Sequence, residues 1–281
     1  MKVITLGTGG PLPDPDRHCA STVVQIGDEY LIFDTGRGTL TGIARKGIPF
    51  AAINPLFITH HHVDHIGELP DYLIASWMGG RREPRHVFGP PGTRAIVQTH
   101  LTQIYDKDVE FRTTGENAFG PFAPVEVRET RSGLVHDAGR WRVYAEEVEH
   151  GHGLDFGPVF RQRWICLGYR IEAEGKVVSI SGDCVTCDGA LRLARDSDLH
   201  VQCCYLAASE LKTPHLQRVA KYTLACSDTV GKIATAAGVR RMVLTHFRHM
   251  RPEVLASIDA DVRKDFSGDL ALARDLDEFE V

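Results

Sequence analysis

The stretch T-H-H-H-V-D-H-I-G at residues 59–67 constrains this chain more than any other part of it. It follows a short hydrophobic run and holds four metal-binding side chains within six positions: His60, His62, Asp64 and His65. Alternate residues of an extended backbone point to the same side, so two of the imidazoles can share one metal ion. Zinc accepts nitrogen and carboxylate ligands at about 2.0–2.2 Å, and the remaining pair can hold a second ion. A merely polar, histidine-rich loop is the alternative, but H-x-H-x-D-H leaves few positions free.

This pattern resembles the metal-binding loop of the metallo-β-lactamase superfamily. Four further elements of that family occur in the expected order along the chain. Each is an Asp or a His directly after a β-run, namely Asp34 in D-T-G, His150, Asp183 and His246. The resemblance implies a chain of the α/β (α+β) class, arranged as a four-layer αββα sandwich with its metal loops along one edge.

The resemblance also implies a role for each of these side chains. His60, His62 and His150 would hold the first metal ion, Asp64, His65 and His246 the second, and Asp183 would bridge the two. Two ions about 3.5–4 Å apart can ionise a water molecule between them, and this bridging hydroxide would attack an ester bond. We expect two Zn2+ ions, while Mn2+ or Fe would suit the same ligand types.

Several other side chains near the metal loops have roles that the sequence leaves open. Asp34 is expected either to orient a metal-binding histidine or to cap a turn, and Asp64 could act as a general base besides being a ligand. His150 is preferred over His152 as a ligand because it ends a strand. Candidates for a general acid are His249, His215, Tyr169 and Tyr205. The histidines at positions 18, 86, 100, 136 and 200 are expected on the surface or half-buried.

Two clusters outside these motifs also allow more than one interpretation. Cys184 and Cys187 form a C-x-x-C pair directly after Asp183. These thiols could bind metal or respond to oxidation, or they could be small apolar residues below the start of a helix. The arginine cluster at residues 81–85 is expected to be a solvated loop.

The pattern along the chain is that of one layered domain. Short β-runs occur at residues 2–7, 22–26, 30–34, 55–59, 141–148, 165–171, 176–181, 200–205 and 241–245. Helical patterns lie between them at 68–78, 93–105, 189–196 and 213–237, and residues 113–123 are expected to form a loop. No low-complexity segment or Pro-rich linker separates the halves, so residues 1–281 are expected to form a single domain.

Further motifs narrow the resemblance to the ribonuclease Z and arylsulfatase-like branch. They are L-G-T-G-G-P at 6–11, F-G-P-P-G at 88–92, G-Y-R at 168–170, S-G-D at 181–183 and L-T-H-F at 244–247. Two features depart from ribonuclease Z itself. That enzyme inserts a long arm that grips tRNA between its G-Y-R segment and the bridging Asp, where this chain has only residues 171–181. It also carries an H-E-A-T segment with a catalytic histidine, and residues 200–207 lack that sequence.

Composition bears on the location and on the substrate. The chain contains no apolar run of the roughly 18 residues that a membrane span needs, and no secretory signal. Seven cysteines, an odd number, suit a reducing cytoplasm better than a disulfide framework. A net charge of −5 gives no general attraction to nucleic acid or to anionic membranes.

We therefore expect a metal-dependent hydrolase with a small-molecule substrate, either an ester, a lactone, a sulfate ester or a phosphodiester, and we disfavour nucleic acid. One alternative is a tRNA 3′-processing endonuclease of the ribonuclease Z type. Another is a non-hydrolytic metal or redox protein on the same scaffold. Relatives in this superfamily often form homodimers, and the apolar helices of this chain are compatible with one.

Overall fold

Two seven-stranded sheets pack face to face in this computed structural model, which describes residues 1–281. The first sheet has the strand order β14 (Asp277–Glu280), β1 (Lys2–Gly7), β2 (Ser21–Ile26), β3 (Glu29–Phe33), β4 (Ile53–Phe57), β5 (Arg85–Gly89) and β6 (Val125–Glu129). The second has the order β13 (Asp269–Leu272), β12 (Arg241–Thr245), β11 (Leu199–Cys203), β10 (Lys176–Ile180), β9 (Cys166–Ala173), β8 (Trp141–Val148) and β7 (Gly133–Asp137).

The burial of each strand follows its place in the sheet. β11 lies between two parallel neighbours and is buried at every position, as expected for a strand covered on both faces. β8 lies nearer the edge and buries Trp141, Val143 and Ala145 on the side that faces the first sheet. These side chains join residues of the first sheet in a shared core of 23 buried residues between the sheets.

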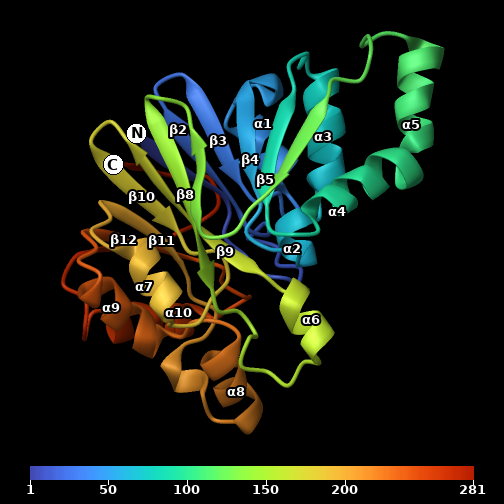
Figure 1. Cartoon of the computed structure of the whole chain (residues 1–281). Coiled ribbons are helices and arrows are strands. Elements are labelled where there is room, and N and C mark those ends of the chain that lie inside the picture. Colours follow the sequence, from blue (N-terminus) through green and yellow to red (C-terminus); the bar gives the residue numbers. More distant parts are fainter.

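Helices cover the outer faces of both sheets (Figure 1). The helices of the chain are α1 (Thr39–Arg45), α2 (Val63–Ile66), α3 (Leu69–Met78), α4 (Thr93–Thr99), α5 (Asp106–Glu110), α6 (Pro158–Arg163), α7 (Asp188–Ala194), α8 (Pro214–Tyr222), α9 (Ser227–Ala236) and α10 (Pro252–Val262). Short 3-10 or π turns add η1 (Phe50–Ala52), η2 (His100–Ile104), η3 (Phe111–Glu116) and η4 (Ala208–Glu210). No helix is both long and apolar enough to cross a membrane.

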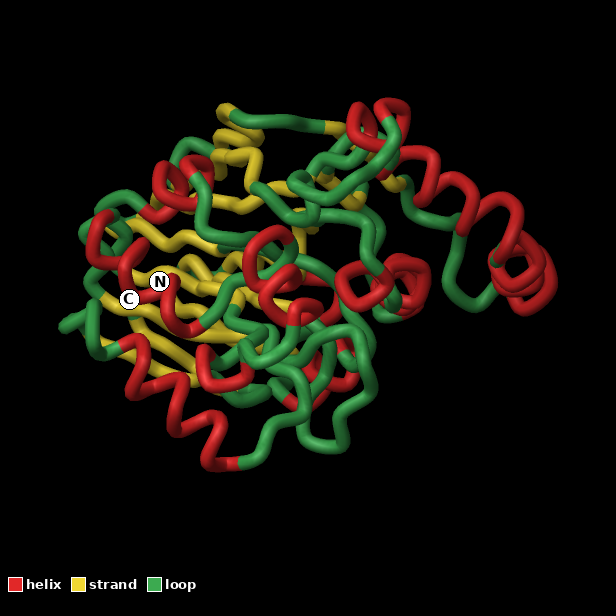
Figure 2. Tube along the Cα trace, turned by 90° about the horizontal axis from the view of Figure 1, so that it is seen from below, coloured by secondary structure: helices red, strands yellow, loops and turns green.

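Three hydrophobic cores separate four layers. One core lies between the sheets, a second packs the first sheet against α1, α3 and α4, and a third packs the second sheet against α7, α9 and α10. The predicted four-layer αββα sandwich is therefore confirmed. The segment from α4 to η3 projects from the layered body in both views (Figure 2).

Some details differ from the prediction. The pattern at 213–237 forms two helices, because α8 ends at Tyr222 and α9 begins at Ser227. Part of the expected loop 113–123 is the turn η3. The arginine cluster is not a solvated loop throughout, since Arg81 and Arg85 are buried and bond to backbone carbonyls. His200 lies in the interior of β11 and is fully buried, because its ring finds hydrogen bonds to Ser179 Oγ and Gln202 Oε1.

Candidate metal centre

The predicted metal-binding residues follow the carboxyl ends of strands that run the same way. β3 and β4 are parallel in the first sheet, and β10, β11 and β12 are parallel in the second. β8 is antiparallel to β9, which is antiparallel to β10, so β8 also points in this direction. The loops after β4, β8, β10 and β12 therefore meet at one edge, where ligand sites of layered folds usually lie.

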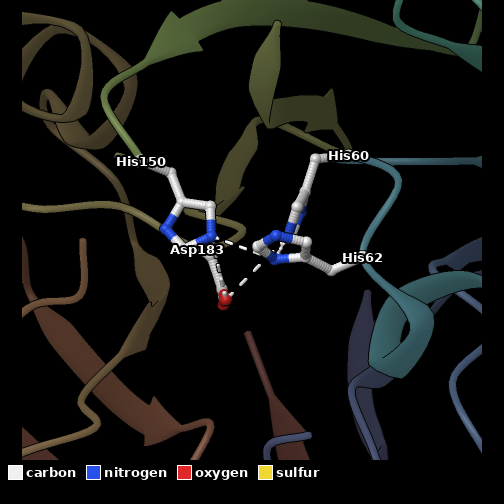
Figure 3. A group of neighbouring side chains, drawn as sticks. All are labelled: His60, His62, His150 and Asp183. Carbon is white, nitrogen blue, oxygen red and sulfur yellow. Dashed lines mark hydrogen bonds and ion pairs between the residues drawn. The ribbon is translucent and has the colours of Figure 1, made fainter. Parts of the chain in front are cut away.

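The first group of side chains consists of His60, His62, His150 and Asp183 (Figure 3). His62 Nδ1 lies 3.0 Å from His60 Nε2 and 3.1 Å from His150 Nε2. Asp183 Oδ2 approaches His60 Nε2 to 3.9 Å and His150 Nε2 to 3.8 Å. Three imidazoles and one carboxylate oxygen thus point at a common centre.

The second group consists of Asp64, His65, His246 and again Asp183. His246 Nε2 lies 3.2 Å from Asp64 Oδ2 and 3.2 Å from Asp183 Oδ1. His65 Nε2 lies 3.5 Å from Asp183 Oδ1. Asp183 therefore faces the first group with one carboxylate oxygen and the second group with the other, as a bridging ligand does.

Buried atoms without partners show that these residues fit cations. His65 Nε2 and Asp183 Oδ1 are both buried and form no hydrogen bond. An unsatisfied buried nitrogen and carboxylate oxygen are costly unless a ligand satisfies them. The donor set of imidazoles and carboxylates is one that divalent metal ions accept. The fold and this cluster indicate a divalent-metal site.

The outward-facing nitrogens of two histidines are fixed by hydrogen bonds. His150 Nδ1 lies 2.5 Å from the carbonyl oxygen of Thr223, and His65 Nδ1 lies 2.7 Å from Asp34 Oδ2. Asp34 also accepts bonds from the backbone N–H and the hydroxyl of Thr59. Of the two roles considered for Asp34, its contacts therefore match the orientation of a histidine, which is how metal-binding imidazoles are commonly held.

The electrostatic environment keeps lone pairs available on the first group. Burial lowers the pKa of His150 to about 4 and lowers the pKa of His60 well below its ordinary value. Burial would raise the pKa of Asp183, but His246 and His65 hold it well below the ordinary range. Burial lowers the pKa of His65, yet Asp183 and Asp34 together raise it well above the ordinary value.

A cleft of about 550 Å³ opens over the two groups. Its lining outside the seven clustered residues includes three titratable side chains, Tyr205, His215 and Arg248, and the apolar residues Leu12, Val63, Leu216, Val219 and Leu224. Arg248 forms an ion pair with Glu210. The sequence motifs did not single out Leu12 or Arg248, because each reaches the cleft through a tertiary contact that leaves no local pattern. Val63 lies within the metal loop, but its apolar side chain gave no reason to select it.

Two of the general-acid candidates lie elsewhere. The side chain of His249 is 69% exposed, faces Asp14 at 3.4 Å and does not line the cleft, although its neighbour Arg248 does. Tyr169 is buried between the sheets and donates its hydroxyl to the carbonyl oxygen of Ile58. Tyr205 and His215 are therefore the two candidates that the fold brings to the cleft.

His152 and the C-x-x-C pair lie beside the two groups but belong to neither of them. His152 Nδ1 accepts a bond from the backbone N–H of His150, and its Nε2 lies 3.1 Å from the carbonyl oxygen of Trp164. Cys184 is buried, and Cys187 accepts the N–H of Ala190 at the start of α7. All seven cysteines are free. This environment agrees with the interpretation of both cysteines as small residues below a helix start.

The connection from β9 to β10 is a tight hairpin with a turn at Glu174 and Gly175. No arm is inserted there, as the short spacing predicts. The backbone after β11 passes into Tyr205 and Leu206, and Tyr205 is the residue of this segment that reaches the cleft.

Comparison with known proteins identifies the family. A model of the beta-lactamase superfamily domain matches residues 30–247. Ribonuclease Z from Mycobacterium marinum is 31% identical to this chain over 100% of the chain and 99% of the relative. Ribonuclease Z from Mycobacterium bovis is 30% identical over 100% of the chain and 98% of the relative.

Solved structures share the same architecture. Human tRNase Z, short form, superposes with a TM-score of 0.74 at 22% identity and covers 100% of this chain and 99% of its own. The metallo-β-lactamase fold protein YhfI from Bacillus subtilis also gives 0.74, at 19% identity, and covers 100% and 98%. Fold and site together define a metal-dependent hydrolase that acts on ester bonds. The chain belongs to the metallo-β-lactamase superfamily, in its ribonuclease Z branch.

The expectation of a small-molecule substrate, with nucleic acid disfavoured, is wrong. The curated relatives that span the whole chain are named ribonuclease Z, and these are enzymes of RNA. The error came from the missing arm and H-E-A-T segment and from the net charge, which sums over the whole surface and does not show how charge is distributed around one cleft. The non-hydrolytic alternative has no support among these relatives.

Proposed function

We propose that this chain is a metal-dependent endonuclease of the ribonuclease Z type, which hydrolyses a phosphodiester bond at the 3′ end of precursor tRNA. The observation that carries the proposal is the full-length similarity to ribonuclease Z, at 30–31% identity, in a chain with a complete cluster of metal-binding side chains. Small-ester hydrolysis does not account for that similarity.

The ligand assignment is part of the proposal. One ion would be held by His60, His62 and His150, the other by Asp64, His65 and His246, with Asp183 shared between them. Zinc is the proposed metal, in two equivalents, because imidazole and carboxylate ligands suit it. Bound there, divalent cations would polarise the phosphodiester and lower the pKa of a water molecule.

The remaining steps fall to side chains of the cleft. Asp34 would keep His65 in one orientation through the bond of 2.7 Å. Either Tyr205 or His215 would supply the proton to the leaving oxygen, since both line the cleft and neither belongs to the cluster. Arg248 would attract a phosphate oxygen, although Glu210 shares its charge.

Three further statements complete the proposal. Residues 1–281 would act as one domain, which the core shared by both sheets supports. A cytoplasmic location is supported by seven unpaired cysteines. A homodimer would follow the habit of the superfamily.

The test is cleavage of a precursor tRNA with a 3′ trailer by the zinc-loaded protein. We expect one cut that releases the trailer and about two equivalents of zinc per chain. His62→Ala and Asp183→Asn should each lower the rate roughly 100-fold or more and reduce zinc retention. The matched control is His61→Asn, because His61 faces Thr93 and does not belong to the cluster.

Two outcomes would reject the proposal. One is an intact trailer at every salt concentration with fully metal-loaded protein. The other is undiminished cleavage after metal removal. Retained zinc in Asp183→Asn would reject the ligand assignment alone.

A further inference from the structure

The helix α8 lies along the cleft, with some of its side chains lining the cleft and others exposed to solvent. His215, Leu216 and Val219 line the cleft. Arg218 and Lys221 lie on other positions of the same helix and are exposed, as is Lys212 just before it. A helix of this length spans about 13 Å along the cleft.

The cations of α8 carry no counter-charge. No Asp or Glu occurs between Leu211 and Ser227, and none of Lys212, Arg218 and Lys221 forms an ion pair. Arg218 and Lys221 instead lie over the ring of Tyr222, at 5.8 and 4.9 Å from its centroid. Surface cations of this chain are often paired, so an unpaired row is a local excess of positive charge in a chain of net charge −5.

The end of α8 is hydrogen-bonded to the loop that carries His150. The carbonyl oxygens of Tyr222 and Thr223 accept bonds from Gly151 N–H and His150 Nδ1, at 2.6 and 2.5 Å. The same segment after His150 leads into α6, which carries Arg161 and Arg163 on its surface. Figure 1 shows α6 and α8 together along the lower margin of the molecule.

α6 is anchored beside the first histidine group. The ring of Trp164 lies 4.9 Å from that of His62, and Phe160 stacks on Trp164 at 5.4 Å. Trp164 Nε1 also donates to the carbonyl oxygen of His150. The metal site is thus flanked by two short elements whose exposed charge is predominantly positive, with Asp155 as the acidic neighbour of Arg161.

We propose that Lys212, which precedes α8, and Arg218 and Lys221 of α8, with Arg161 and Arg163 of α6, form a cationic rim that binds the phosphates of single-stranded RNA entering the cleft. The inference rests on the proposed function and names the surface that would replace the absent arm. Phosphate contacts of this kind supply sequence-independent affinity, and they weaken steeply with salt. An anionic membrane or an acidic protein would be attracted by charge alone, but neither requires that the charge lie beside a metal site.

The experiment measures the binding of a short fluorescent single-stranded RNA to the full-length protein by anisotropy, between about 50 and 200 mM salt. The rim variant is Lys212→Ala/Arg218→Ala/Lys221→Ala. The matched control is Arg45→Ala/Lys107→Ala/Lys232→Ala, which removes the same charge from exposed cations on α1, α5 and α9. Thermal unfolding of both variants checks that each is folded.

We expect the rim variant to bind RNA roughly tenfold more weakly at low salt, with the log–log salt slope reduced by about 2, while the control follows the wild type. Equal losses in both variants, or an unchanged salt slope in the rim variant, would overturn the proposal. So would rim-dependent binding to phosphatidylserine vesicles in a protein that does not bind RNA.

A cleavage assay separates this proposal from the proposed function. If the wild type binds RNA through the rim but leaves precursor tRNA intact, the rim proposal is supported and the proposed tRNA-processing function is rejected. If the wild type cleaves precursor tRNA and the rim variant cleaves it with an unchanged KM, the proposed function is supported and the rim proposal is rejected.

Discussion

At the scale of single residues, this protein uses buried histidines in two different ways. In the cluster, the buried His60 and His150 turn their Nε2 atoms toward the exposed His62, and the buried His65 Nε2 and Asp183 Oδ1 have no hydrogen-bond partner. His200 is equally buried, but Ser179 and Gln202 satisfy both of its ring nitrogens. The first arrangement calls for a cation, and the second is a complete hydrogen-bonded unit of the core.

His200 should make the stability of the protein depend on pH. Burial lowers its pKa from 6.5 to about 4, so the unfolded chain takes up this proton first as the pH falls. Protonation of His200 has no effect on the free energy of unfolding above pH 6.5. Between pH 6.5 and 4 it lowers that free energy progressively, by up to about 3 kcal/mol.

Denaturant unfolding of wild type and His200→Gln across this pH range tests the point. The variant should lose less stability on acidification than the wild type, although it is less stable at neutral pH. Other histidines titrate in both proteins, so the difference between the two slopes isolates His200. Parallel slopes would contradict the assignment.

At the scale of elements, the metal loops depend on close backbone packing at strand ends. Gly182 follows β10 with a φ of +59°, and a Cβ there would lie 2.8 Å from the carbonyl oxygen of Leu167 and 2.9 Å from Thr59 Cβ. Leu167 and Thr59 themselves join the two sheets through an N–H to carbonyl bond of 2.9 Å. The loop that carries Asp183 is therefore packed closely against Leu167 and Thr59.

Gly182→Ala should displace Asp183 and weaken the metal site. We expect a loss of stability well above the roughly 1–2 kcal/mol of a left-handed backbone, together with weaker zinc binding. Gly27→Ala is the control, because Gly27 has a φ of +57° with nothing within 4 Å of its Cβ position. Calorimetric unfolding and a zinc competition titration give both values. Equal losses of stability at the two positions would show that close packing around Gly182 is not critical.

At the scale of the whole molecule, the site exists because two sheets meet at one edge. Tyr169 of β9 packs against Phe33 and Phe57 of the first sheet, at 5.7 and 5.3 Å between ring centroids. Its hydroxyl donates to the carbonyl oxygen of Ile58, directly before the metal loop. This residue ties the two sheets together next to the cluster.

Tyr169→Phe should lower the free energy of unfolding by about 1–3 kcal/mol, since a buried carbonyl oxygen loses its donor. Tyr30→Phe provides the comparison, because the hydroxyl of Tyr30 forms no hydrogen bond and the residue is only partly buried. Urea unfolding measures both changes. A neutral Tyr169→Phe would mean that the hydrogen bond between the sheets contributes little.

Much of this molecule could be predicted from the sequence. The H-x-H-x-D-H run and the strand-final residues Asp34, His150, Asp183 and His246 are local patterns, and the structure brings them together as the order along the chain implies. Their role as ligands stays a prediction. The strands β1 to β4 and β8 to β12 were equally readable, because alternation and apolar runs are properties of short segments, whereas β5, β6, β7, β13 and β14 were not predicted.

The tertiary structure decided what no segment encodes by itself. It removed His249 from the cleft, left Tyr205 and His215 in it, and buried His200. It also gathered unpaired cations beside the metal centre of an acidic chain, which the net charge could not reveal. The physical reason is that ligand types and periodicity are set by neighbours in sequence. Which side chains share a cleft, and how charge is distributed around it, depends on packing between segments far apart in the chain.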